Sequence, residues 1–426
     1  MARNRDNVSI AEALPLSFQH VVAMIVGCIT VPIVVSGAAG LSESQRILMI
    51  QASLICAGIA ILVQSFSIKG IIGSNLPVIV GSGFAFISTM TSIVNRLDIS
   101  YLFGAQMIGA LVGMGFALLY KKIKFLFAPV VKASVVMTIG ISLYKTAMNY
   151  MAGGAGNADY GSMANWALAF FTLIITLVYS HWGKGVLRQA STLFGLLTGY
   201  IVSLILGVVS FDALNGQPLF QLVTPFTFGI KFSSSAIVPM AVVFIISAVQ
   251  DIGQFEATAI SVYDRDATDK ELTGGIIGNN VGSFLGSIFG GPPNATAGQN
   301  VGLVSQTQVT DKKVFYLSSL IVIIIGLFPK LSAIFLTIPY PVLGGATVTV
   351  FSSISMTGTK MLAEDGLTKR NMAIAGLSIT MGIGVLFLPD AFSGFPEAIA
   401  NIISNEIVLT ATLAIILNLV LPKETE

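Results

Sequence analysis

The feature that most constrains this chain is a succession of long apolar runs along its whole length. Each run has about 17 to 25 residues, enough for a helix to cross the ~30 Å hydrocarbon core of a bilayer. The chain of 426 residues is 54% hydrophobic and 10% charged, whereas an ordinary soluble domain has roughly 25% charged residues. The sequence therefore predicts an integral membrane protein without a soluble domain between its spans.

About fourteen apolar runs qualify as spans. We place them near residues 14–36, 45–66, 72–95, 101–120, 128–149, 164–181, 190–209, 236–257, 274–289, 296–309, 314–335, 339–358, 371–389 and 404–421. The two cysteines, Cys28 and Cys56, both fall inside such runs. Buried thiols in apolar segments act as small hydrophobic groups, so neither a disulfide nor a metal site is expected.

The basic residues indicate how the spans are oriented. Most of them share alternate loops with both termini: Arg3, Arg5, Lys69, Lys121, Lys122, Lys124, Lys184, Arg188, Arg265, Lys270, Lys312, Lys313, Lys360, Lys369, Arg370 and Lys423. The opposite loops hold Arg46, Arg96, Lys231 and Lys330. The positive-inside rule then predicts a multi-pass protein of the cell (inner or plasma) membrane, with both termini cytoplasmic and an even number of spans.

Two spans are interrupted by glycine and proline. The later one, residues 290–313, begins GGPPNATAGQNVG, and the earlier one, residues 71–86, reads IIGSNLPVIVGSGFAF, in which Val78 to Val80 favour a strand. Broken backbone at membrane depth is tolerated where it is buried in protein or lines a polar cavity. The interruptions lie about half the chain apart, which predicts an inverted repeat with a midplane binding site. The alternative is two unrelated Gly- and Pro-rich segments.

Embedded polar residues cluster in the eighth span, SAVQDIGQFEATAIS. Gln250 and Gln254 share one helix face, and Asp251 is turned about 100° away. Asp251 and Glu256 are the two acidic residues that are clearly embedded in spans. Glu256 lies near the cytoplasmic end, where a solvated or structural role is expected. His20 is the histidine within a span, and a packed, hydrogen-bonding role is the more common one for such a residue.

The polar constellation is therefore rich in amides: Gln250, Gln254, Gln299 and Asn300, beside free backbone N–H groups near Gly83 and Gly298. An amide donates and accepts hydrogen bonds from one planar group, which suits a neutral ring with alternating N–H and C=O groups. A nucleobase has this pattern.

Several motifs then resemble the nucleobase-ascorbate transporters (nucleobase:cation symporter-2, the xanthine/uracil permeases). They occur in the family's order and cover essentially the whole chain: Phe18-Gln19-His20, Gly81 to Phe86, Pro292 to Gly302 with Gln299-Asn300-Val301-Gly302 and Thr307, and Pro339 to Ala346. The resemblance implies an all-α polytopic membrane protein of about 14 transmembrane segments in two inverted seven-span repeats. The broken third and tenth spans would contain short extended strands.

The resemblance also implies domains and roles. A core domain would comprise residues 14–120 and 233–336, and a gate domain residues 121–210 and 337–421. Gln250 and Gln299 would hydrogen-bond the base with Gln254 nearby, Phe84 and Gly298 would offer backbone N–H groups, and Asn300 would brace the tenth span. The expected protein is a homodimeric proton symporter without a cofactor, and nothing suggests binding to nucleic acid.

Two positions depart from the family. Gln250 stands where relatives usually have Glu, and Gln308 where they have Arg, Lys or Gly. Because Gln250 cannot titrate, proton coupling would need another group, either Asp251 or His20, or transport would be uncoupled and facilitative. The alternative for Asp251 is a purely structural role, in which it only pairs with other residues of the helix bundle.

The sequence thus predicts a secondary-active nucleobase permease that favours xanthine or urate. Gln299 and the QNVGLV segment resemble the purine branch, whereas Pro293, Asn294 and Gly298 resemble the uracil branch, which keeps a uracil permease open. A transporter of small anions with the same architecture is a further alternative. A channel would need a continuous polar stripe through several spans. An enzyme is not expected, because no His/Cys/carboxylate grouping supplies a nucleophile and a base.

Overall fold

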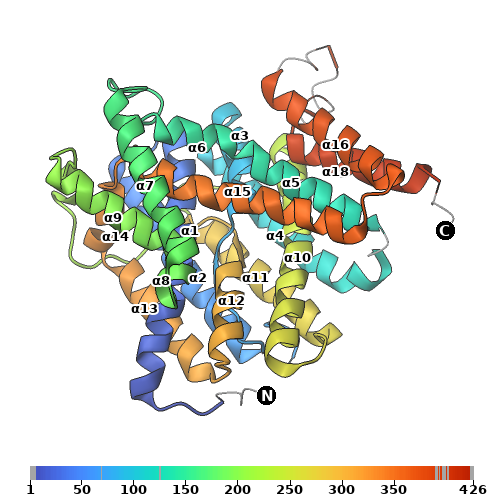
Figure 1. Ribbon diagram of the computed structural model, residues 1–426, viewed down its shortest axis with the longest axis horizontal. Coiled ribbons are helices and arrows are strands. Elements are labelled where there is room, and N and C mark those ends of the chain that lie inside the picture. The colour runs from blue at the N-terminus through green and yellow to red at the C-terminus, as the bar shows by residue number, and fades with distance from the viewer. Residues whose placement is uncertain are drawn as a thin grey trace.

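The computed structural model describes residues 6–68, 70–123, 126–388, 392, 394–395, 400 and 403–422. It is a bundle of helices around one short pair of strands (Figure 1). Basic residues that support the predicted orientation but lie outside the described residues are Arg3, Arg5, Lys69, Lys124 and Lys423.

Seven helical segments of the described chain are long and apolar enough to cross a membrane. They are α1 (Ile10–Ala38), α2 (Glu43–Phe66), α4 (Ile99–Ile123), α5 (Pro129–Ser142) with α6 (Tyr144–Met151), α7 (Met163–Trp182), α10 (Ser234–Tyr263) and α16 (Lys369–Phe387). More polar or shorter helices are α11 (Asp269–Phe289), α15 (Tyr340–Asp365), α9 (Ser191–Ile205) and α18 (Glu406–Val420). The predicted polytopic helical class is confirmed, and the count of fourteen spans stays a prediction.

The eleventh predicted span, residues 314–335, is not one straight helix. α13 (Lys312–Leu327) and α14 (Pro329–Leu336) meet at 81°. Pro329 has no backbone N–H and disfavours helical backbone at the preceding residue, and Phe328 is extended with φ −106° and ψ 98°. The predicted span is therefore bent, because this proline begins a new helix.

The helices pack in two groups. In the first, α2 packs against α1, α11 and α13, and α4 packs against α10 and α11. In the second, α15 packs against α5, α6, α7 and α9, and α16 packs against α5 and α18. In Figure 1, α15 and α5 run side by side above α10, α11 and α12. The grouping describes packing; the predicted core and gate domains stay a prediction.

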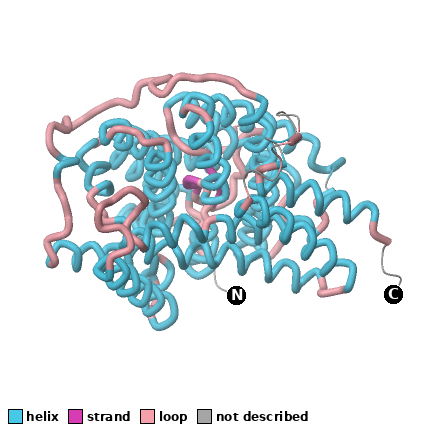
Figure 2. Tube along the Cα trace, turned by 90° about the horizontal axis from the view of Figure 1, so that it is seen from above, coloured by secondary structure: helices cyan, strands magenta, loops and turns pink. Residues whose placement is uncertain are grey.

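The two interrupted segments meet as an antiparallel strand pair near the middle of the bundle (Figure 2). Strand β1 (Val80–Ser82) pairs with β2 (Asn294–Thr296), with Gly81 opposite Ala295. The Gly83 N–H donates to the Pro293 carbonyl at 2.9 Å and extends the ladder. Paired antiparallel strands from corresponding places in the two halves are the arrangement that an inverted repeat requires.

A helix follows each strand. The 3-10 helix η1 (Phe84–Phe86) and α3 (Ile87–Arg96) follow β1, and α12 (Gly298–Thr307) follows β2. Because the strands are antiparallel, the two helices leave the pair in opposite directions, with their N-termini close to it. The loops hold two single-turn helices, α8 (Val186–Gln189) and η3 (Asp212–Leu214).

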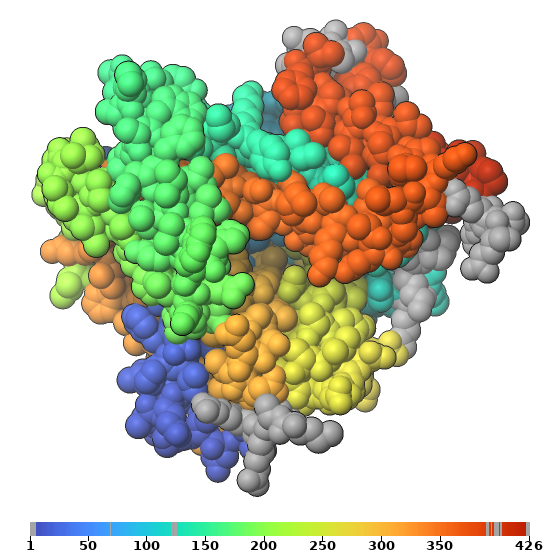
Figure 3. Space-filling model, viewed as in Figure 1, coloured from blue at the N-terminus to red at the C-terminus, as the bar shows by residue number. Residues whose placement is uncertain are grey.

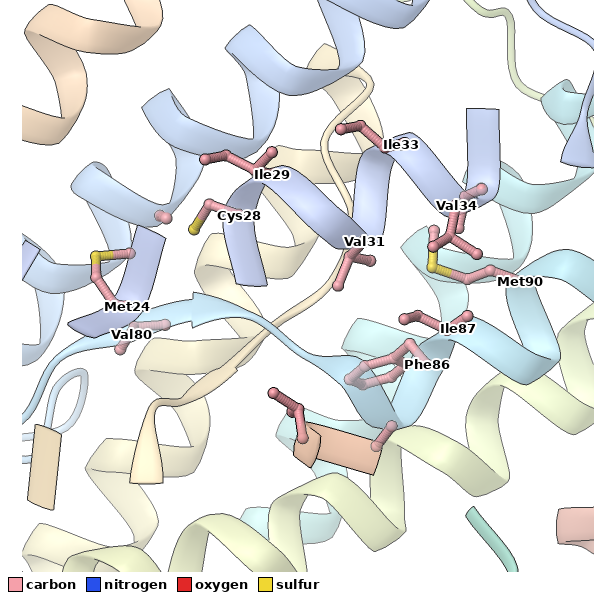
Figure 4. Close-up of a cluster of buried hydrophobic side chains, with 14 of the residues drawn as sticks. Met24, Cys28, Ile29, Val31, Ile33, Val34, Val80, Phe86, Ile87 and Met90 are labelled. Carbon is pink, nitrogen blue, oxygen red and sulfur yellow. The ribbon is translucent and has the colours of Figure 1, made fainter. Parts of the chain in front are cut away.

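The first strand and α3 are embedded in the apolar core. Figure 4 shows Val80 beside Met24 and Cys28 of α1, and Phe86, Ile87 and Met90 packed together. Cys28 and Cys56 are buried free thiols. Glycine is required at Gly83, because a Cβ there would lie 2.9 Å from the Phe86 ring and 3.1 Å from the Ala295 Cβ.

Candidate functional site

Three glutamine amides lie on two neighbouring helices, α10 and α12. Gln250 and Gln254 project from α10 and are half-buried, and Gln299 in the first turn of α12 is exposed. A Cβ built on Gly298 would lie 3.3 Å from the Gln254 amide nitrogen, so the Gln254 side chain lies against the N-terminus of α12. None of the three amides makes a side-chain hydrogen bond within the described residues, so each is available to a ligand.

Backbone donors lie at both ends of the strand pair. Phe84 begins η1, and Gly298 and Gln299 begin α12. The first N–H groups of a helix have no partner inside it, and the helix dipole places partial positive charge there. The N–H groups at two such helix ends can donate hydrogen bonds to carbonyl oxygens on a ligand ring. The Phe84 ring meets the Phe351 ring of α15 edge-on, with 5.9 Å between centroids, which joins this site to the second group of helices.

Asp251 points into the protein rather than toward these amides. One carboxylate oxygen accepts from the Thr296 N–H at 2.8 Å, and the other accepts from Asn279 Nδ2 at 2.8 Å. Asn279 Nδ2 also donates to the Thr296 hydroxyl at 3.0 Å, and Asn279 Oδ1 accepts from Gln64 at 2.6 Å. The Asp251 carboxyl group therefore ties β2 to α10 and α11, and through Gln64 to α2.

Asn300 and His20 form a second bracing contact. His20 Nδ1 and Asn300 Oδ1 are 2.6 Å apart, and both side chains are buried. The contact ties α12 to α1, and the His20 ring also lies 5.3 Å from the Phe315 ring of α13. Asn300 therefore faces away from the exposed surface of α12 that carries Gln299. His20 Nε2 and Asn300 Nδ2 have no partner within the described residues.

The three amides line neither of the two cavities described below. Figure 3 shows a hollow of the molecular surface between α15 above and α10 and α12 below. Two partly open cavities lie elsewhere: one of about 160 Å³ bounded by α3, α10 and Asn405, and one of about 100 Å³ near Tyr263 and Lys312. We take the hollow as the candidate site, because the two helices on its lower side, α10 and α12, carry the three unpaired amides.

Sequence reasoning missed three functional candidates. Asn279 and Gln64 complete the Asp251 network, and the signal for Asn279 was the pair Asn279-Asn280 inside a span. Glu406 is a third embedded carboxyl group, 3% exposed, whereas the sequence indicated only Asp251 and Glu256 as clearly embedded. Its signal was its place at the beginning of the last apolar run. Glu256 accepts from the Ala267 N–H at 2.9 Å, a structural role.

Solved structures match the fold over nearly the whole chain. The transmembrane domain of a cyanobacterium bicarbonate transporter, BicA, is 18% identical with a TM-score of 0.58, covering 98% of this chain and 100% of that one. A structure of SLC26A9 is 13% identical with a TM-score of 0.64, covering 96% of this chain and 66% of that one. At these identities the likeness concerns the fold, which is that of a membrane transporter with two inverted repeats.

Proteins of similar sequence identify the family. A xanthine permease of Bacillus subtilis is 35% identical, over 96% of this chain and 93% of that one. A putative purine permease of Clostridium perfringens is 32% identical (98% and 92% covered), and the uric acid permease PucJ of Bacillus subtilis is 34% identical (95% and 91%). The model of a permease family, Xan_ur_permease, matches residues 11–391. The chain therefore belongs to this permease family, the nucleobase:cation symporter-2 family that its motifs resemble.

Proposed function

We propose that this chain is a secondary-active nucleobase permease that favours xanthine- or urate-type purines and works by proton-coupled alternating access. The observation that carries the proposal is the set of three unpaired amides, Gln250, Gln254 and Gln299, beside two helix N-termini. The names of the relatives, which are xanthine and uric acid permeases, support the same substrate class.

Recognition would use complementary hydrogen bonds. The Gln250 and Gln299 amides would pair with alternating N–H and C=O groups on the base, and Gln254 would complete the set. The N–H groups of Phe84 and Gly298 would donate to ring carbonyl oxygens. Each buried bond of this kind contributes ~1 to 3 kcal/mol when its loss leaves a partner unpaired.

Alternating access would come from the two packed groups of helices. The core domain, residues 14–120 and 233–336, would carry the substrate, and the gate domain, residues 121–210 and 337–421, would cover it from either side. The edge-on contact between Phe84 and Phe351 crosses this boundary. By the same resemblance, the protein would be a homodimer in the cell membrane with cytoplasmic termini, which cross-linking and labelling of terminal tags would check.

Proton coupling requires a titratable group near the bound substrate. Gln250 cannot titrate, so the coupling candidates at this site are Asp251 and His20, and the alternative is an uncoupled carrier. We expect Gln250→Glu to increase proton-driven accumulation of substrate, because it introduces a carboxyl group beside the bound base. Accumulation that stays at the wild-type level in folded Gln250→Glu protein would show that coupling does not run through this position.

The function is tested by uptake into proteoliposomes of radiolabelled xanthine, urate and uracil, with and without an inward proton gradient. We expect saturable uptake of xanthine or urate, larger with the gradient, and displacement of the label by purines more than by uracil. Displacement mainly by uracil would reverse the substrate order. Folded, reconstituted protein that binds and carries none of the three bases would overturn the proposal.

A further inference from the structure

A buried carboxyl group joins the two groups of helices away from the amide site. Glu406 begins α18 and is 3% exposed, and its side chain accepts a hydrogen bond from the hydroxyl of Ser88. Ser88 lies in the first turn of α3, four residues after Phe84. The contact therefore connects α18 of one group directly with the broken segment that contributes to the binding site.

The surroundings of Glu406 give it few other partners. Within the described residues its carboxylate has Ser88 as its side-chain hydrogen-bond donor. The preceding residue, Asn405, caps α18 by accepting from the N–H groups of Ile407 and Val408 at 3.2 and 3.0 Å. Burying an ionised carboxylate costs free energy unless it is well paired, so one hydroxyl and a helix N-terminus leave the ionised form in a poor environment.

A cavity beside this contact gives water a place next to the interface. Its volume is about 160 Å³, which holds several water molecules. Polar lining comes from Ser92 and Arg96 of α3, Ser235 of α10, and Asn405. The cavity thus spans the boundary between the two groups, and Arg96, which is exposed, lies on its wall.

The charged neighbours of Glu406 are few. Arg96 of α3 interacts electrostatically with it, and salt in the surrounding water screens an exposed charge of this kind. On α16 the residues after Arg370 include no titratable side chain, and Arg370 itself bonds to Asn418 at the opposite end of α18.

The other helices packed on α18 direct their charges elsewhere. Lys132 of α5 interacts with Asp365, and Asp251 of α10 is held by Asn279 and Thr296. The loop before α18 contains Asp390 and Glu397, which lie outside the described residues.

We propose that Glu406 is a titratable positioning residue of the transport cycle: its contact with Ser88 holds α18 against α3, and ionisation of Glu406 favours their separation. A neutral carboxyl group can remain in the closed interface, whereas the ionised group gains hydration when the interface opens. α3 leaves the strand pair in the opposite direction from α12. The contact between Glu406 and Ser88 therefore lies on the face of the protein away from the Asp311–Val8 contact near the N-terminus. With the N-terminus expected in the cytoplasm, the Glu406 contact is expected on the extracellular side. The inference rests on the proposed function for its place in a transport cycle.

The test follows the opening of the interface without any substrate. Ser92→Cys places a thiol in the cavity, and a membrane-impermeant maleimide labels it in intact cells at external pH between about 5 and about 8. Asn95→Cys, an exposed position on the same helix, corrects for the pH dependence of the thiol itself. The parent protein, whose Cys28 and Cys56 are buried, gives the background.

We expect labelling of Ser92→Cys to rise with pH more than labelling of Asn95→Cys. Glu406→Gln keeps the acceptor for Ser88 but cannot ionise, so the excess pH dependence should disappear. Ser88→Ala removes the donor and should raise labelling about fivefold at low pH, the factor for one lost hydrogen bond. Glu364→Gln, the same change at an exposed carboxylate paired with Lys360, is the matched control and should behave like wild type.

Two outcomes would overturn the inference. One is an excess pH dependence that persists in folded Glu406→Gln protein; the other is Ser88→Ala labelling at the wild-type rate, a result that can be read even where Glu406→Gln fails to fold. Xanthine uptake by the same cells is measured separately. Failure of uptake with the labelling pattern intact would count against the proposed function, whereas normal uptake with no labelling pattern would count against the role of Glu406 alone.

Discussion

The two interrupted segments are built alike but are buried to different extents. In the first, Val80 and Phe86 are fully buried, and α3 begins in tightly packed apolar surroundings. In the second, Gly298 and Gln299 at the start of α12 are exposed. In an inverted repeat, one interrupted segment can thus be a buried structural element, here called the wall (Val80 to Phe86), while the other is exposed, here called the open face (Gly298 and Gln299). The paired interruptions mark the proposed site, and of the two segments the second carries one of the unpaired glutamine amides, Gln299.

The largest expected effect comes from breaking the wall. Gly83→Val would place a branched side chain where even a Cβ lies 2.9 Å from the Phe86 ring. Overpacking of this kind costs about 1 to 3 kcal/mol or more, so we expect loss of folded, membrane-inserted protein in fluorescence size-exclusion chromatography. Gly302→Val is the matched control, because a Cβ on Gly302 has nothing within 4 Å. Equal expression of both variants would contradict the comparison.

Different side chains hold the two strands: Asp251 holds β2, and Ser53 contacts β1. A second pair of variants tests the two contacts separately. The two oxygens of Asp251 accept from two donors, the Thr296 N–H and Asn279 Nδ2. In Asp251→Asn one of these oxygens becomes an NH₂ group, which cannot accept, so one donor loses its partner. We expect a loss of about 1 to 3 kcal/mol, and a fall of substrate exchange and accumulation together. Ser82→Ala, which loses the 2.7 Å contact between the Ser82 and Ser53 hydroxyls, should cost less. Exchange that stays intact while accumulation is abolished would instead identify Asp251 as the proton carrier.

Removing the amides should affect the open face alone. Gln299→Ala and Gln250→Ala each delete one proposed hydrogen bond to the base, so we expect xanthine binding to weaken tenfold or more at unchanged melting temperature. Scintillation proximity binding measures the affinity, and Asn215→Ala in an exposed loop is the control. Wild-type affinity in both glutamine variants would remove these residues from the site.

The smallest effect is expected at Gly298. A Cβ there would come within 3.3 Å of Gln254 Nε2, the end of a flexible side chain that can move by a few tenths of an ångström. We expect Gly298→Ala to weaken binding about two- to fivefold, through the displaced amide, and to leave stability within about 0.5 kcal/mol. Isothermal titration with xanthine would resolve the change, and a loss as large as that of Gln299→Ala would mean that the base packs too closely on Gly298 to leave room for a methyl group.

Local pattern was enough to predict the polytopic helical class and the two interruptions, whereas the count of fourteen spans and the role of the amides stay predictions. Val78 to Val80 were expected to be extended, and β1 begins at Val80. Long-range partners were not predictable: nothing near Asp251 in sequence indicates Asn279 and Thr296, and nothing near Glu406 indicates Ser88. Such contacts depend on register between segments far apart in the chain. The bend at Pro329 was missed because apolar length alone was used to define that span.

The strand pair also constrains how the protein can be made. β1 is synthesised about half a chain before β2, so its backbone waits without its partner while the intervening helices enter the bilayer. Unpaired backbone groups are costly in hydrocarbon, so the translocon or neighbouring protein must shelter the first broken span until the second arrives. Neither half of the chain, produced alone, could form the β1–β2 pair. We therefore expect assembly to finish late, after the ribosome has synthesised β2.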